Sequence, residues 1–194
     1  HNSSATGMQA IPAAGAAMGL QFREEEGLGQ EVEGEHPPMV LCSIGDAAMT
    51  EGEVSEALHM SALKGLPILF VVQDNEWDIS AHSSEIRFAD AMTTIKAYPG
   101  IDARSVAGHN LAACDEVMEW AFHRVRSLRQ PALIHARVPL LGHHTSGVRR
   151  EWYRDDLEEA AGRDPLPHLR NALIERGFES HALDRISNEC REQV

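Results

Sequence analysis

Two short apolar stretches flank a segment with helical periodicity, and this arrangement constrains the fold more than any other feature of the sequence. The stretches MVLCSI (39–44) and LPILFVV (66–72) have the length of buried strands, and neither is long enough to span a bilayer. The segment between them predicts a helix over 51–64, and Thr50 and Glu53 have the spacing of a capping box. Small and apolar residues recur on one helix face: Val54, Ala57, Leu58, Ser61 and Ala62. The pattern predicts a βαβ unit.

The alternation of strands and helices continues along the chain. A helix is predicted near 88–96, a strand at 103–108 and another strand at 132–138. A long helix between these strands has an apolar stripe made of Cys114, Val117, Met118, Ala121, Phe122, Val125 and Leu128. Together these elements predict an α/β fold, a parallel sheet flanked by helices on both faces, with ligands bound at the carboxyl ends of the strands.

Further helices are expected on either side of this core. Residues 5–20 are rich in Ala and Gly and predict a buried helix that contains Pro12, followed by an acidic surface loop at 23–38. Asp164-Pro165 predicts the start of a helix, and a polar helix closes the chain.

One domain over residues 1–194 is expected, with a core at about 1–150 and a helical extension at about 151–194.

The charge of the chain limits its partners. The sequence has 17 Lys and Arg residues and 30 Asp and Glu residues, so its formal net charge is −13, which argues against nucleic acid or an anionic membrane as a partner. Three cysteines without CxxC spacing suit a reducing compartment, so a cytoplasmic location is expected. The start at His1 and the closing helix suggest a segment of a longer chain.

Three loops follow strands of the predicted sheet: GDAAMTEG (45–52), DNEWDIS (74–80) and PLLGHHTSGVRREWYR (139–154). Asp46 and Asn75 offer a carboxylate and an amide oxygen at adjacent strand ends, and a main-chain carbonyl such as that of Trp77 can add a third ligand. Mg²⁺ prefers oxygen ligands and completes its shell with phosphate and water. The predicted helix N-terminus near Glu51 suits an anion at the same edge. Taken singly, Asp46 is better explained as a helix cap or turn residue and Asn75 as a turn former than as metal ligands.

The stretch GDAAMTEGEVSEALHMSALKGLPILFVVQDNEWDIS (45–80) resembles the thiamine-diphosphate-binding motif, in which GDG is followed one βαβ unit later by NN or N. The form of the motif is similar to that in the α subunit of the decarboxylating component of 2-oxo acid dehydrogenase complexes. SSATGMQAIPAAGAA resembles the family's Ser-rich turn and the helix that follows it. The family's P-x-LIE strand and GHHSTSD-type loop are similar to PALIHARVPLLGHHTSG. Its YR is similar to WYR, and its DPI-x-RLR-x-YL segment is similar to DPLPHLRNALIERG. The similarity runs from about Ser3 to Gly177.

The resemblance implies a thiamine-diphosphate-binding fold and a set of site residues. It implies that Mg²⁺ is bound by the side chains of Asp46 and Asn75 and by the main chain of Trp77. The residues implied to contact the cofactor are Gly45, Asp46, Ala47, Ala48, Asn75, Trp77, Ile79 and His144. His144 is also implied to contact the diphosphate or assist acyl transfer, with His143 beside it. Without the resemblance, both are interpreted as surface loop histidines.

Several residues depart from the family pattern. Ala47 replaces the second Gly of the motif, Asp74 replaces its first Asn, and Gln73 replaces an Arg of some members. Met8 stands where some relatives have a Thr that helps to bind a monovalent cation, so that cation is not implied for this chain.

The resemblance implies an oxidoreductase of a multienzyme complex, an acyl-transferring 2-oxo acid dehydrogenase. It would use thiamine diphosphate and Mg²⁺ for the oxidative decarboxylation of a 2-oxo acid and transfer the acyl group to the lipoyl group of the acyltransferase component. GHH followed by Thr-Ser favours branched-chain substrates over pyruvate. The activating Glu of the family is on the β partner. Activity is therefore expected only with a β subunit or with a β half in a fused α–β chain. The fused chain is the favoured form. Such α–β units are expected to form a homo-oligomer.

Two alternatives come from other classes of protein. A non-catalytic structural or regulatory relative of the same fold is favoured by Ala47 and Gln73 and opposed by the presence of Asp46, Asn75 and His144. A generic nucleotide-binding domain is disfavoured, because the sequence has neither GxGxxG nor GxxxxGK[ST].

Overall fold

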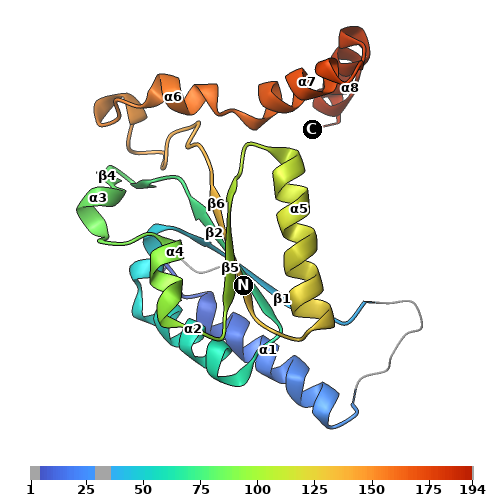
Figure 1. Ribbon diagram of the computed structural model, residues 1–194. Coiled ribbons are helices and arrows are strands. Elements are labelled where there is room, and N and C mark those ends of the chain that lie inside the picture. The colour runs from blue at the N-terminus through green and yellow to red at the C-terminus, as the bar shows by residue number, and fades with distance from the viewer. Residues whose placement is uncertain (1–4, 29–35, 194) are drawn as a thin grey trace.

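The computed structural model describes residues 5–28 and 36–193, and its centre is a four-stranded parallel sheet (Figure 1). The strands lie in the order β1-β2-β6-β5. Their bounds are β1 (Val40–Gly45), β2 (Ile68–Asp74), β5 (Asp102–Ala107) and β6 (Ala132–Arg137). The predicted parallel α/β sheet is therefore confirmed, and each predicted strand lies within two residues of an observed one.

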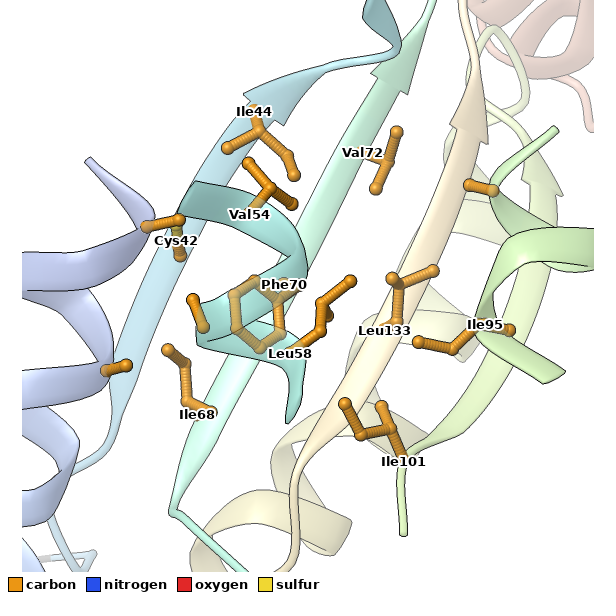
Figure 2. Close-up of a cluster of buried hydrophobic side chains, with 14 of the residues drawn as sticks. Cys42, Ile44, Val54, Leu58, Ile68, Phe70, Val72, Ile95, Ile101 and Leu133 are labelled. Atoms are coloured by element: carbon orange, nitrogen blue, oxygen red, sulfur yellow. The ribbon is translucent and has the colours of Figure 1, made fainter. Parts of the chain in front are cut away.

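Helices cover both faces of this sheet. The helices α1 (Ala10–Glu25), α2 (Gly52–Lys64) and α4 (Ala91–Thr94) contribute to a core on one face, and α5 (Leu111–Phe122) packs on the other. A π-helical turn at His123–Ser127 continues α5 and keeps Val125 buried. Figure 2 shows the first core, in which side chains of α2 lie over those of β1, β2 and β6.

β2 is the most buried strand because helices lie on both of its faces. Ile68, Phe70 and Val72 point toward α2, whereas Leu69 points toward α5, and all four are fully buried. This alternation follows from the two-residue period of a strand. β1 is an edge strand of the described sheet and pairs only with β2 there, and Leu41 on β1 is 50% exposed.

The first helix is displaced from its predicted position. It was expected at 5–20 but begins at Ala10 and continues to Glu25, into the start of the predicted acidic loop. Pro12 is compatible with the helix because it lies in the first turn, where its missing N–H has no intrahelical acceptor. Residues 29–35 of the predicted loop lie outside the described residues.

The predicted capping box at the start of α2 is wrong. Residues 47–50 form a 3₁₀ turn, so the Thr50 hydroxyl donates to the carbonyl of Ala47, 2.8 Å away, inside that turn. Glu51 becomes the N-cap residue, without a side-chain hydrogen bond to the helix. The predicted face of α2 is confirmed at its buried positions, Val54, Ala57, Leu58 and Ser61.

Short elements fill the connection between β2 and β5. A hairpin of β3 (Trp77–Asp78) and β4 (Ala81–His82) precedes α3 (Ser83–Ile86). The helix expected at 88–96 is confined to α4 and a 3₁₀ turn at Ile95–Ala97, because the Asp90 side chain accepts from the N–H of Thr93 and caps α4.

The C-terminal helices lie beyond the carboxyl edge of the sheet (Figure 1). They are α6 (Leu157–Gly162), α7 (Pro165–Glu175) and α8 (Ser180–Glu192). Asp164 caps α7 by accepting from the N–H of Leu166, 2.9 Å away, as its position before Pro165 predicts. Among the described residues no helix is both long and apolar enough to cross a membrane.

Candidate functional site

The loops after β1, β2 and β6 meet at one edge of the sheet. The N–H of Asp46 donates to the carbonyl of Gln73 (3.2 Å), and the N–H of Val138 donates to the carbonyl of Asp74 (2.8 Å). Asp74, at the end of β2, is therefore flanked by both neighbouring strands. The sequence-based expectation that these strand ends are adjacent is confirmed.

Asp46 is a buried carboxylate with incomplete hydrogen bonding. Its Oδ2 lies 3.2 Å from Nη2 of Arg87, but no group among the described residues donates a hydrogen bond to this oxygen. Burial and, to a smaller extent, the charge of Asp74 raise the pKa of Asp46, whereas Arg87 and the main-chain N–H groups of Asp46 and Asn75 lower it, and the net result is a pKa raised to about 6. The Asp46 carboxylate is thus buried, and one of its two oxygens accepts no hydrogen bond from the described residues.

Asp74 is also buried, but its hydrogen bonding is extensive. Nη2 of Arg87 donates to Oδ1 and Oδ2 at 2.8 and 3.0 Å, and the N–H of Glu76 donates to Oδ1 at 3.1 Å. Nε2 of His135 lies 2.7 Å from Oδ2. Burial alone would raise the pKa of Asp74, but the hydrogen bonds from His135 and Arg87 outweigh it and lower the pKa well below its usual range.

His135 extends this cluster into the sheet. It lies on β6, is 3% exposed, and its Nδ1 is 3.3 Å from the hydroxyl of Ser105 on β5. In a neutral imidazole, Nε2–H donates to Asp74 and Nδ1 accepts from Ser105. A continuous polar chain therefore runs from β5 through β6 and β2 to Arg87.

The second loop is a tight turn that orients Asn75 and Trp77. Oδ1 of Asn75 accepts from the N–H of Trp77, 2.9 Å away, and Glu76 has a positive φ of 66°. The Trp77 ring is buried, with ring centroids of Tyr153 and His82 5.2 and 5.0 Å away. This packing fixes the main chain whose carbonyl was predicted to bind Mg²⁺.

The third loop is fastened next to Trp77 by Arg154. This arginine is buried, donates to the carbonyl of Leu140 at 2.6 Å, and forms two hydrogen bonds with the Asp156 carboxylate at 2.7 and 2.8 Å. Asp156 also lies 3.5 Å from Nε1 of Trp77. Both ends of the loop are thereby attached to the predicted site.

The two predicted catalytic histidines lie on the exposed part of this loop. His143 accepts from the N–H of Arg150 through Nδ1 (3.2 Å), and His144 is exposed. Within residues 5–28 and 36–193, no hydrogen bond or ion pair joins either histidine to Asp46 or Asn75. The main-chain N–H of Asn75 bonds to the Asp46 carboxylate, so the structure brings these two predicted ligands together, whereas, in the described ranges, neither histidine is bonded to them.

The remaining predicted cofactor contacts lie around the same edge. Gly45 is the last residue of β1, and Ala47 and Ala48 form the turn after it, with Ala48 buried. A Cβ on Gly45 would meet no atom within 4 Å. Ile79 is 43% exposed and has a φ of 55°. Small side chains thus leave the main chain beside Asp46 accessible.

The donor groups at this edge fit a hard cation. The unsatisfied oxygen of Asp46 is a carboxylate, and Asn75 and Trp77 can add amide and carbonyl oxygens. No group of three or more His, Cys, Asp or Glu side chains is placed to bind a metal in the described part of the chain. The oxygen set suits Mg²⁺ shared with a phosphate ligand better than a metal bound by protein side chains alone.

Sequence reasoning missed the roles of Arg87 and His135. His135 interrupts the apolar run ALIHARV, and a titratable residue inside a buried strand is a signal that it has a polar partner. Arg87 gave no signal, because it comes from a connection whose path depends on the tertiary fold.

Comparisons with known proteins agree with this arrangement. The family model described as "Dehydrogenase E1 component" matches residues 1–194. The 3-methyl-2-oxobutanoate dehydrogenase subunit alpha of Mycobacterium tuberculosis is 32% identical over 180 residues, which cover 92% of this chain and 46% of that protein. The pyruvate dehydrogenase E1 component subunit alpha of Porphyra purpurea is 31% identical over 146 residues, 73% of this chain and 42% of that protein. The chain thus spans less than half the length of these relatives.

The fold is also found in a solved structure. Transketolase from Campylobacter jejuni superposes with a TM-score of 0.60 and 22% sequence identity, over 83% of this chain and 26% of that chain. This likeness confirms the predicted fold class. Since the family model covers the whole sequence, the chain belongs to the dehydrogenase E1 component family, and the relatives with which it aligns are alpha subunits of 2-oxo acid dehydrogenases.

Proposed function

We propose that this chain binds thiamine diphosphate through Mg²⁺ and takes part in the oxidative decarboxylation of a 2-oxo acid. The observation that supports this most directly is the buried Asp46 carboxylate, which has an unsatisfied oxygen beside the turn of Asn75. A buried carboxylate oxygen that accepts no hydrogen bond is costly, and a bound cation would compensate for that cost. When bound, thiamine diphosphate supplies the electron sink for loss of CO₂.

The chain's own residues would bind and orient the cofactor. Asp46, Asn75 and the Trp77 carbonyl would coordinate the cation, and the ring packing of Trp77 would keep that carbonyl in place. Gly45, Ala47, Ala48 and Ile79 would contact the cofactor, since three of them are too small to obstruct a diphosphate at the strand ends.

His144, with His143 beside it, would act at the diphosphate or in acyl transfer. Both side chains are exposed on the loop that Arg154 fastens next to Trp77. An exposed position at the rim is suited to a group that meets an acyl acceptor arriving from outside.

The branched-chain 2-oxo acids are the proposed substrate class, with the lipoyl group of the acyltransferase component as acyl acceptor. The name of the mycobacterial relative and the GHH-Thr-Ser loop support this choice over pyruvate. The proposed partners are a β subunit or β half, which would complete the active site, and a further copy of the α–β unit. We also propose that the protein acts in the cytoplasm.

Calorimetric titration of the purified full-length assembly with thiamine diphosphate, with and without Mg²⁺, tests this function. We expect binding that requires Mg²⁺. Asp46→Ala should abolish it, whereas Asp115→Ala, which removes an exposed carboxylate on α5, should leave it unchanged. Circular dichroism of both variants checks that the fold is retained.

Two results would contradict the proposal. Unchanged affinity in Asp46→Ala would remove the metal assignment. Absence of binding by the wild-type assembly would favour a non-catalytic relative, in which Arg87 serves as a permanent counter-ion for Asp46.

A further inference from the structure

We propose that Arg87 competes with the divalent cation for Asp46: it pairs with Asp46 when no metal is present and releases Asp46, while staying on Asp74, when the metal binds. Arg87 would thus be a positioning residue that sets the metal affinity. The inference rests on the proposed function, because it takes Asp46 as a metal ligand. It adds a competing group that none of the sequence motifs includes.

Arg87 bonds to the two carboxylates unequally. Its Nη2 forms two hydrogen bonds with Asp74, at 2.8 and 3.0 Å. The contact with Asp46 is a 3.2 Å ion pair without hydrogen-bond geometry, and Oδ2 of Asp46 has no other donor among the described residues. The contact with Asp46 is therefore the weaker of the two and the first to be exchanged.

The guanidinium is itself incompletely satisfied. The side chain is 8% exposed, and Nη1 is buried without a hydrogen-bond partner in the described part of the chain. A purely structural buried arginine normally uses most of its five N–H donors. An unused donor beside an unsatisfied carboxylate indicates an arrangement that a ligand completes.

The charges of the cluster favour entry of a cation. Asp46 and Asp74 contribute two negative charges and Arg87 one positive charge, so with a neutral His135 the cluster keeps one net negative charge. A divalent cation at Asp46 must replace the guanidinium, because two positive groups at the same oxygen repel each other. Asp74 and His135 keep Arg87 within the cluster during this exchange.

The test measures Mn²⁺ binding to the full-length assembly by electron paramagnetic resonance, without thiamine diphosphate. Arg87→Gln removes the competing charge, so we expect Mn²⁺ to bind at least about tenfold more tightly than to wild type. Arg104→Gln is the matched control, because it removes an exposed arginine that stacks on Trp120 in the other face of the sheet, and it should leave the Mn²⁺ affinity unchanged.

A second variant separates loss of the competing guanidinium from the change in net charge of the cluster, and circular dichroism of each variant checks that the fold is retained. The double substitution Arg87→Gln with Asp74→Asn removes one positive and one negative charge, so the net charge of the cluster stays that of wild type. It should also bind Mn²⁺ at least about tenfold more tightly, because Asp46 has lost its competing guanidinium. A structural role alone would not raise metal affinity in either variant.

The outcomes separate this inference from the proposed function. Suppose that both variants bind Mn²⁺ no more tightly than wild type does, while wild type still binds thiamine diphosphate. This result would overturn the role of Arg87 and leave the proposed function in place. Absence of Mn²⁺ binding in wild type and variants, even with thiamine diphosphate added, would overturn the metal site and the inference together.

Discussion

The substitution Asp74→Asn should strongly destabilise the metal-free protein. The Asp74 side chain is 5% exposed and accepts hydrogen bonds from Arg87, from the N–H of Glu76, and from His135 at 2.7 Å. An asparagine keeps one acceptor oxygen but loses the charge and the second oxygen. Two hydrogen bonds to a charged group, each contributing about 1.5–3 kcal/mol, are weakened. Since a change of imidazole tautomer can restore one of them, we expect a loss of about 1.5–3 kcal/mol, which reaches the lower end of the range for a broken buried ion pair.

Urea unfolding of the purified full-length protein in EDTA measures this loss. Asp115→Asn is the control, because Asp115 is an exposed carboxylate on α5, and it should change the free energy of unfolding by less than about 0.5 kcal/mol. Adding Arg87→Gln to Asp74→Asn should cost less than the sum of the two single substitutions, with a coupling energy of about 1–3 kcal/mol. A loss below about 1 kcal/mol for Asp74→Asn, or strict additivity in the double variant, would refute the argument that this pair stabilises the buried cluster.

Two further predictions concern a close backbone contact and the effect of pH. Gly100→Ala should lower the unfolding temperature by several degrees, because its Cβ would lie 2.7 Å from the carbonyl oxygen of Ala62, whereas Gly142→Ala, with no atom within 4 Å, should have little effect in the same thermal scan. The metal-free wild-type protein should become more stable as the pH falls from about 7 to about 4, because the folded-state pKa of Asp46 is raised from 3.8 to about 6. Urea unfolding midpoints measure this gain, and the Asp46→Asn variant should lack it. At still lower pH, below 3.8, protonation of Asp74 should remove stability, because its folded-state pKa is lowered. A wild-type midpoint that falls steadily between pH 7 and 4 would contradict the assignment for Asp46.

The sheet could be predicted from the sequence because its signal is local and repeated. The run LPILFVV is apolar on both faces, which indicates a central strand, and β2 is central. The predicted loops after β1 and β2 follow from the parallel topology, and Asp46 and Asn75 lie where that topology requires. Element boundaries were less accurate, as at α1 and α4, because caps and first turns depend on a few hydrogen bonds such as that of Asp90.

The polar cluster could not be predicted in the same way because it is non-local. Arg87, Asp74 and His135 come from three separate segments, and only the folded sheet places them in contact. The capping box failed for a related reason, since Thr50 has an acceptor in its own turn that the spacing rule does not consider. The positions of His143 and His144 relative to Asp46 likewise depend on a loop fastened by Arg154.

The exposed edge of β1 affects how this protein should be handled. On the described chain this strand pairs with β2 on one side only, and half-exposed Leu41 lies on it. An unpaired strand edge offers main-chain N–H and C=O groups as a template for strand addition. The 194-residue chain expressed on its own is therefore expected to self-associate through this edge, and light scattering should detect oligomers whose share grows with protein concentration.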